Sequence, residues 1–219
     1  MARADRVLRT DGEVTRTRIL QAAGELFAAT GFAETTSKQI AATAVVDVAS
    51  INYHFGSRSG LYRAVLVEAH RRLISGDVLR QLAATDMAAK DKLRKIIEIA
   101  VEAALGRHGW HSTVLIRELL SPSSHLDFLQ RTEVIPKLDV FLEIFSEITS
   151  IPAGDPALLR CLISVVAPCS LLLVTRQSHS LITAEIFDSP RDALVEHLYR
   201  FSVGGLEAVA RDHKIRDAP

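Results

Sequence analysis

Three helix-start signals lie close together in the first third of the chain, and they constrain its fold more than any other feature. Thr36 and Gln39 have the spacing of a capping box, which satisfies the free amides at the start of a helix. Asp47 is suited to cap a short helix over residues 48–55, and Ser57 to cap the helix after it. With the helix upstream, this pattern predicts a helix-turn-helix within a small bundle.

The rest of the chain also has helical periodicity. Apolar residues recur at helical spacing over residues 15–31, where Gly31 supplies a stop signal. From Leu61 onward no strand-like alternation occurs, and aromatic residues make up only 5% of the chain. Prolines fall near the expected breaks, at Pro122, Pro136, Pro152, Pro156 and Pro190. We therefore predict an all-α protein, with an N-terminal three-helix unit and a larger C-terminal helical domain.

The longest uncharged apolar run, residues 161–175, is short for a membrane span. It holds fifteen residues and a proline, whereas a span needs about 20 residues, so we expect a buried helix and no membrane contact. Cys161 and Cys169 would lie roughly 12 Å apart along it, too far for an intrachain disulfide, although a bridge between two chains stays open. Two cysteines and no export signal favour the cytoplasm.

The charge distribution is uneven although the net charge is zero. Residues 1–72 carry ten Lys and Arg against seven Asp and Glu, so the remainder of the chain is acidic by the same margin. A basic N-terminal third fits contact with a polyanion. A solvated basic face is the alternative.

The two faces of the helix over residues 48–55 differ in chemistry. Ile51 and Phe55 lie four residues apart and should pack inward. The other face is small and polar, with Ala49, Asn52 and Tyr53 flanked by Ser50 and His54. Such a face fits the major groove, where Asn can bind adenine and a small apolar side chain can meet a thymine methyl. The alternative is a capped helical hairpin in a bundle core.

Groups that can donate to phosphate lie on this helix and beside it. Contacts of this kind fix the register of a protein on DNA and do not read its sequence. Helix N-termini, where two of the flanking groups lie, favour phosphate as well. The candidates are Ser50, Tyr53 and His54 on the helix, Ser37 and Lys38 at the start of the preceding helix, and Arg58 at the start of the next.

Residues 15–62 resemble the DNA-binding domain of TetR-family transcriptional regulators. The resemblance is carried by "ILQAAGELFAATGFAETTSKQIAATA" and above all by "INYHFGSRSGLY". It implies that residues 48–55 form the recognition helix, with Tyr53, His54 and Arg58 at phosphate-contact positions. The DNA-contact candidates are Ser37, Lys38, Val48, Ala49, Ser50, Asn52, Tyr53, His54 and Arg58.

Two positions depart from the family pattern. Val45 replaces the usual glycine of the turn, so the turn is expected to lack a left-handed residue or to be slightly remodelled. Gly60 stands where an acidic residue commonly completes a capping box after Ser57. Neither change removes a DNA contact.

The C-terminal part resembles the regulatory domain of the YbiH/CecR-like subgroup of the same family. The segments that resemble this domain are "IRELLSPSS" and "VIPKLDVFLEIFSEITSI". We expect a flexible basic arm over residues 1–14 and the helix-turn-helix domain over 15–62, with a linking helix to about residue 75. Residues 76–219 would then form a helical domain for ligand binding and dimerisation.

Two apolar helices predict how the chain dimerises. "ALLRCLISVVAPCSLLLV" is apolar on nearly every side, and "LVEHLYRFSVGGLEAVA" contains Gly204 and Gly205, which permit close helix approach. Packing both against their symmetry mates gives a four-helix interface. The homodimer would read a palindromic operator, with its recognition helices about 34–36 Å apart. The alternative is that both are intrachain core helices.

The predicted function is a ligand-responsive transcriptional repressor with an unidentified small-molecule effector. Trp110, His111, Arg117 and Glu118 are candidate ligand contacts, although Arg117 and Glu118 could form a structural ion pair or an interdomain contact and Trp110 could be core. His108 and His111 lack further metal ligands at suitable spacing, so no metal or cofactor is expected. A helical enzyme or an interaction protein without DNA binding are the alternatives. No catalytic motif favours the enzyme.

Overall fold

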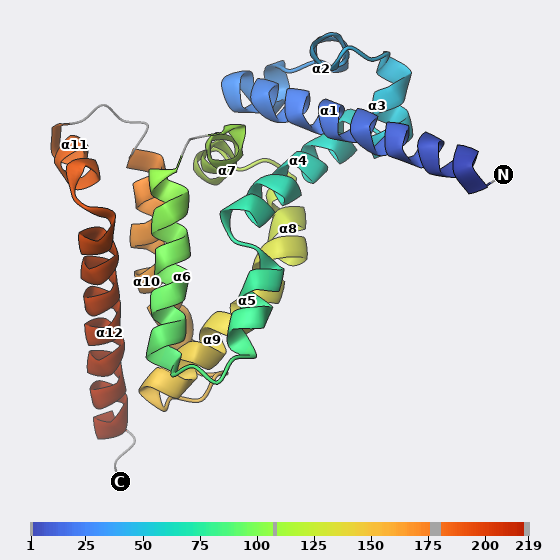
Figure 1. The fold of residues 1–219 in the computed structure, drawn as a ribbon. Helices are drawn as coiled ribbons and strands as arrows, with labels where there is room; N and C mark the ends of the chain where they lie inside the picture. The colour runs from blue at the N-terminus through green and yellow to red at the C-terminus, as the bar shows by residue number, and fades with distance from the viewer. Residues whose placement is uncertain (1, 107–108, 176–180, 217–219) are drawn as a thin grey trace. The chain divides into compact units, whose positions relative to one another are not determined.

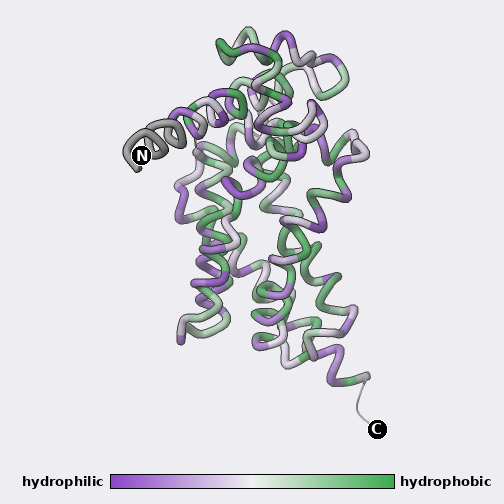
Figure 2. The backbone as a smooth tube through the Cα atoms, turned by 90° about the vertical axis from the view of Figure 1, so that its right-hand side faces the viewer, coloured by the Kyte–Doolittle hydropathy of each residue, from purple (hydrophilic) through white to green (hydrophobic). Residues whose placement is uncertain are grey.

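A computed structural model describes residues 2–106, 109–175 and 181–216, and the described parts are built from helices (Figure 1). Hydrophobic and hydrophilic residues alternate along most of these helices (Figure 2), as expected for amphipathic helices around a core. The elements are α1 (Ala2–Glu34), α2 (Ser37–Ala44), α3 (Val48–Phe55), α4 (Arg58–Leu73), α5 (Gly76–Ala83), α6 (Ala89–Leu105), α7 (Trp110–Leu120), α8 (Leu126–Leu129), the π-helical η1 (Gln130–Val134), α9 (Ile135–Thr149), α10 (Pro156–Thr175), α11 (Leu181–Asp188) and α12 (Arg191–Arg216).

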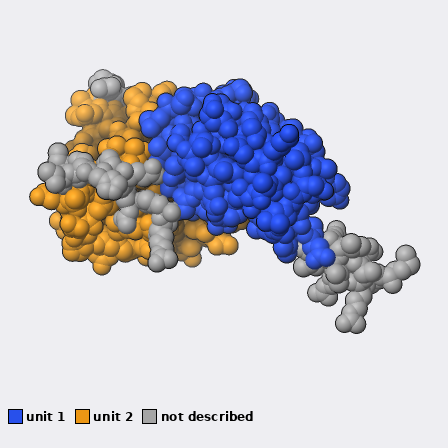
Figure 3. Space-filling view, turned by 90° about the horizontal axis from the view of Figure 1, so that it is seen from above, with its two compact units in different colours: residues 1–72, 108–132 blue, residues 73–107, 133–219 orange. Residues whose placement is uncertain are grey.

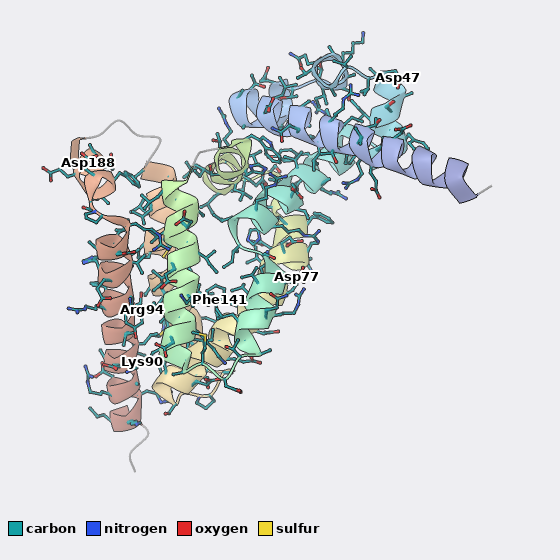
Figure 4. The ribbon with its side chains drawn as sticks, in the orientation of Figure 1. Asp47, Asp77, Lys90, Arg94, Phe141 and Asp188 are labelled. Atoms are coloured by element: carbon teal, nitrogen blue, oxygen red, sulfur yellow. The ribbon has the colours of Figure 1, made fainter. Side chains whose placement is uncertain are left out.

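The predicted capping residues lie at the starts of the three helices that follow α1. The Gln39 amide donates to Thr36 Oγ1 at 3.2 Å, and the Thr36 amide donates to Gln39 Oε1 at 2.7 Å, which completes the capping box. The Ser50 amide donates to Asp47 Oδ1 at 2.6 Å at the start of α3 (Figure 4). The Gly60 amide donates to Ser57 Oγ at 3.0 Å at the start of α4.

The chain divides into two compact units (Figure 3). Unit 1 contains residues 1–72 and 108–132, and unit 2 contains residues 73–107 and 133–219. The first boundary, after residue 72, lies close to the expected one near residue 75, but α7 and α8 belong with the N-terminal helices and not with the C-terminal domain. α1 begins at Ala2 and so includes residues 2–14, which the sequence suggested as an arm. That stretch contains no proline to interrupt a helix.

The docking of α7 onto α1 explains why α7 belongs to unit 1. Trp110 is buried, and its Nε1 donates to Gln21 Oε1 of α1 at 2.9 Å. Arg117 donates from Nε to the Ala28 carbonyl at 2.7 Å and from Nη2 to the Ala29 carbonyl at 2.9 Å. The Trp110 indole lies against Gly24, whose missing side chain makes room for it. These contacts join residues nearly 90 positions apart, so local sequence signals do not predict them.

Gly24→Ala is expected to destabilise the protein, although alanine normally favours a helix over glycine by about 1 kcal/mol. A Cβ at Gly24 would lie 2.2 Å from the Trp110 ring, and overpacking of this kind costs about 1–3 kcal/mol. The matched control is Gly12→Ala in the same helix, where a Cβ would meet nothing within 4 Å. Urea unfolding should give a lower free energy of unfolding for Gly24→Ala and an equal or higher one for Gly12→Ala. Equal stabilisation by both changes would show that Trp110 does not pack on Gly24.

Unit 2 is a helical bundle in which α6 packs against α9, α10 and α12. Apolar side chains of α6, α9 and α10 that are almost fully buried form its interior. They include Leu93, Ile97, Val101, Ile144, Phe145 and Leu158. Salt bridges join α6 to α12 at the surface, with 2.6 Å between Lys90 Nζ and Glu207 Oε1 and 2.6 Å between Arg94 Nη2 and Glu196 Oε2 (Figure 4).

One face of α10 is exposed, whereas the sequence predicted a buried helix. Among the described helices, α10 has the length and hydropathy to cross a membrane, yet only 39% of its apolar window is buried. Ala157, Leu158, Cys161 and Val165 face the interior of unit 2. The opposite face carries the exposed residues Leu159, Ile163, Val166 and Leu171. The prediction therefore holds for one face only, and a single copy leaves the other face open to solvent.

Candidate nucleic-acid interface

The short helix α3 is anchored by one face and exposed on the other. Ile51 is fully buried in the unit 1 core, which also contains Ile40 and Leu61. Phe55 packs against the same core, and the guanidinium of Arg16 lies 5.0 Å from its ring centroid. The predicted inward face is confirmed, and its burial fixes which side chains of α3 reach solvent.

The exposed face of α3 carries the residues predicted to contact DNA. Val48, Ala49 and Asn52 are exposed, while Ser50 and His54 are partly buried. Tyr53 is 85% exposed, and its ring meets His54 edge-on with 5.0 Å between centroids. The hydroxyl of so exposed a tyrosine is available as a donor. A tyrosine ring is seldom this exposed unless a binding partner covers it.

The start of α2 adds two further candidates beside this face. Ser37 is partly buried and Lys38 is exposed, at the first two positions of α2. Both residues lie at a helix N-terminus, where the helix dipole favours a negative charge such as phosphate.

Arg58 has internal partners that the sequence did not reveal. Its Nη1 donates to the Thr35 carbonyl at 2.5 Å and to the Phe32 carbonyl at 3.2 Å. Its guanidinium also stacks over the Phe32 ring at 4.3 Å. Arg58 therefore ties the start of α4 to the end of α1, a use that differs from the phosphate contact implied by the family resemblance.

The turn before α3 is made by Val45 itself. Val45 adopts the left-handed conformation, with φ 54° and ψ 53°, at the position where the family resemblance implied glycine. The Val45 amide donates to the Ala42 carbonyl at 3.2 Å, and the Val46 amide donates to the Ala41 carbonyl at 3.0 Å. A β-branched residue in this region is strained by about 1–2 kcal/mol. Of the two alternatives for this turn, the one without a left-handed residue was wrong.

Gly60, the second departure, is required by a close backbone approach. A Cβ at this position would lie 2.0 Å from the carbonyl oxygen of Phe55, the last residue of α3. Any side chain would clash there, so α3 and α4 approach each other through glycine. Gly60 keeps its cap through the Ser57 hydroxyl.

Arg117 and Glu118, two of the four ligand candidates, are held by polar contacts within unit 1. Glu118 is 2% exposed and accepts hydrogen bonds from Tyr62 Oη at 2.8 Å and from the Ser123 amide at 3.0 Å. Burial and the nearby Glu118 carboxylate raise the pKa of Tyr62, so Tyr62 stays a protonated donor. Arg117 and Glu118 form no ion pair with each other. Instead they bind α1 and Tyr62, which agrees with the alternative of contacts to the N-terminal domain.

Trp110 and His111, the other two candidates, stack on each other with 3.8 Å between ring centroids. Within the described residues, the buried Nε2 of His111 lacks a hydrogen-bond partner. Burial and the nearby Arg72 lower the pKa of His111, which favours the neutral ring. His108, considered with His111 as a metal ligand, lies outside the described residues.

Comparison with known families assigns both parts of the chain. Residues 19–65 match the family described as bacterial regulatory proteins, tetR family. Residues 89–206, more than half of the chain, match the C-terminal domain of the HTH-type transcriptional dual regulator CecR. The chain belongs to the TetR family. Its C-terminal domain is of the CecR type.

Individual relatives agree with this assignment. The regulator UidR of Escherichia coli K12 is 31% identical to this TetR-family chain over 68 residues, which are 31% of the chain and 35% of UidR. The match thus spans about a third of the curated relative. FadR from Bacillus subtilis, solved in complex with stearoyl-CoA, superimposes with a TM-score of 0.67 at 18% identity, over 86% of this chain and 98% of FadR. A TetR-like regulator from Rhodococcus sp. RHA1 superimposes with a TM-score of 0.64 at 18% identity, over 88% of this chain and 95% of that regulator.

The CecR-type region of this TetR-family chain contributes to both units. It begins at the first residue of α6 and includes α7, which completes the core of unit 1 through Trp110 and Val114. The same region contributes α10 and part of α12 to unit 2, where a groove of about 160 Å³ lies between these helices. Cys161, Val165, Phe201, Gly205 and Leu206 line this groove. Sequence reasoning did not find the groove, and its only signal was the apolar character of both helices.

Proposed function

We propose that the chain is a transcriptional repressor that binds a palindromic operator as a homodimer and responds to a small-molecule effector. The observation that carries DNA recognition is the exposed polar face of α3 on a helix anchored by Ile51. TetR-family membership supports this use of the face. As a bacterial DNA-binding regulator, the chain would act in the cytoplasm.

The exposed groups divide by the part of DNA that they suit. Asn52, Ala49 and Ser50 face the bases, together with Val48, because amide and small apolar groups read base edges in the major groove. Tyr53 and His54 bind phosphate, together with Ser37 and Lys38 at the start of α2. Arg58 supports this surface from within, since its guanidinium binds the carbonyls of Phe32 and Thr35.

The dimer is proposed to form through α10 and α12. Ile163 on α10 is 68% exposed and Phe201 on α12 is 70% exposed, although both are large and apolar. Both helices border one groove, and Gly204 and Gly205 on α12 leave space for a helix to approach closely. A second copy related by two-fold symmetry presents the same apolar face, so pairing removes both faces from water.

The effector is proposed to be a small molecule bound by the CecR-type domain. FadR, a fold neighbour at 18% identity, was solved with stearoyl-CoA, which supports a ligand role for this kind of helical domain. His111 remains a candidate contact because its buried Nε2 lacks a hydrogen-bond partner among the described residues. Arg117 and Glu118 already have partners in unit 1, which favours a structural role for them.

A gel-shift titration tests the proposed function. The purified chain is mixed with the intergenic DNA upstream of its own gene and with a scrambled duplex of equal length. We expect a shift of the upstream DNA at lower protein concentration, which weakens steeply as salt rises because bound phosphates release counterions. Equal shifts of both duplexes at every salt concentration would contradict sequence-specific regulation.

A further inference from the structure

The left-handed Val45 is held by a residue from a different helix. Arg18 of α1 donates from Nη2 to the Ala44 carbonyl at 2.5 Å and to the Val45 carbonyl at 2.9 Å. These two carbonyls lie where α2 ends and the turn to α3 begins. Val45 is 78% exposed, so packing of its own side chain does not stabilise the strained turn.

The backbone of Arg18 is itself fixed. The next two residues, Ile19 and Leu20, are buried in the unit 1 core. A guanidinium at the end of α2 also faces the negative end of the helix dipole, which favours a positive charge there. The Arg18 side chain therefore connects the rigid α1 to the turn that sets the direction of α3.

The opposite end of α3 is held by the same helix. The Arg16 guanidinium lies over the ring of Phe55, the last residue of α3, at 5.0 Å. α1 thus holds the recognition helix at both ends, through Arg18 at the turn before it and through Arg16 at its final residue.

We propose that Arg18 is a positioning residue for operator recognition, and that it acts through the strained turn at Val45. This inference rests on the proposed function of α3 as the recognition helix. Without Arg18, the two carbonyls lose their charged donor and Val45 can relax from the left-handed conformation. Relaxation of the turn re-aims α3 and weakens every contact that it makes with DNA.

The competing explanation is that Arg18 binds DNA phosphate directly, and salt dependence separates the two. Each phosphate contact contributes about −0.9 to the slope of log K against log salt. Loss of a positioning residue lowers affinity and leaves this slope unchanged. Lys38→Met is the matched control, because Lys38 is exposed at the start of α2 and its loss should reduce the slope by about one contact.

The experiment is a double-mutant cycle of Arg18→Met and Val45→Gly in the full chain. Operator affinity is measured at several salt concentrations, together with Tm. We expect Arg18→Met to weaken binding about tenfold with an unchanged slope, as for one lost charge-assisted interaction. In the Val45→Gly background, where glycine adopts the turn without strain, the same change should weaken binding less than about threefold. Val45→Gly alone should raise Tm by several degrees.

Two results would overturn the proposal. One is an equal loss of affinity from Arg18→Met in both backgrounds, and the other is a slope reduced as much as in Lys38→Met. If the wild-type chain shows no sequence-dependent DNA binding, the proposed function fails instead. The Tm values of the double-mutant cycle then still test whether Arg18 and Val45 are coupled, since additive Tm changes would show that Arg18 does not hold Val45.

Discussion

Replacing Tyr53 and His54 together with alanine should weaken operator binding by at least about 100-fold. Hydrogen bonds to charged groups contribute about 1.5–3 kcal/mol each, and both side chains are proposed to donate to phosphate from α3. Tyr53 is 85% exposed, and the His54 ring contacts Tyr53 and Phe55, so removing both side chains takes no buried residue from the unit 1 core. Fluorescence anisotropy with a labelled operator measures the loss, and far-UV circular dichroism should be unchanged.

Tyr53→Phe separates the hydroxyl from the ring. It keeps the edge-on contact with His54 and removes only the donor, so we expect an intermediate loss of about tenfold. Operator binding that survives the double alanine change would place the DNA on another surface of unit 1. A double variant with reduced helicity would instead indicate a structural role for the pair.

The sequence predicted the starts of α2, α3 and α4 to the residue. The reason is that the caps at Thr36, Asp47 and Ser57 are local, because each binds an amide three residues ahead. Amphipathic spacing likewise identified Ile51 as the anchor of α3. Features of this kind depend on residue type and spacing alone, and both are visible in a sequence.

The roles of Arg18, Arg58 and Trp110 could not be predicted, because their partners lie far along the chain. Arg18 meets carbonyls 26 and 27 residues away, and Trp110 meets Gln21 across 89 residues. A backbone carbonyl accepts a hydrogen bond whatever its residue type, so the sequence carries no mark of these pairings. The family resemblance suggested a phosphate contact for Arg58, and in the folded chain part of its guanidinium is used internally.

The exposed face of α10 fits the predicted dimer helix better than a helix buried within one chain. Because the sequence is apolar on nearly every side of the helix, it predicted that a single small domain could not cover it, but it did not predict which face stays exposed. Unit 2 buries the face with Leu158 and Val165 and leaves the face with Ile163 open. An apolar face that the chain does not cover itself points to a second chain.

Ile163→Glu should convert the proposed dimer into a monomer. Ile163 is 68% exposed in the single chain, so a glutamate there is tolerated by the monomer fold. In a two-fold interface through α10 the change introduces two buried carboxylates of like charge, each with a desolvation penalty of several kcal/mol. We expect the dimer dissociation constant to rise at least about 1,000-fold, which corresponds to about 4 kcal/mol. Analytical ultracentrifugation of the wild type and the variant measures it.

Leu119→Glu is the matched control, because Leu119 is also apolar and 62% exposed but lies on α7 in unit 1. It should leave the dimer intact, whereas loss of the dimer in both variants would reflect a general effect of added charge. Operator affinity should fall in Ile163→Glu because the dimer is lost, since two recognition helices on one palindrome bind far more tightly than one. A variant that stays dimeric would locate the interface away from α10. A monomeric variant with full operator affinity would show instead that recognition does not require the pair.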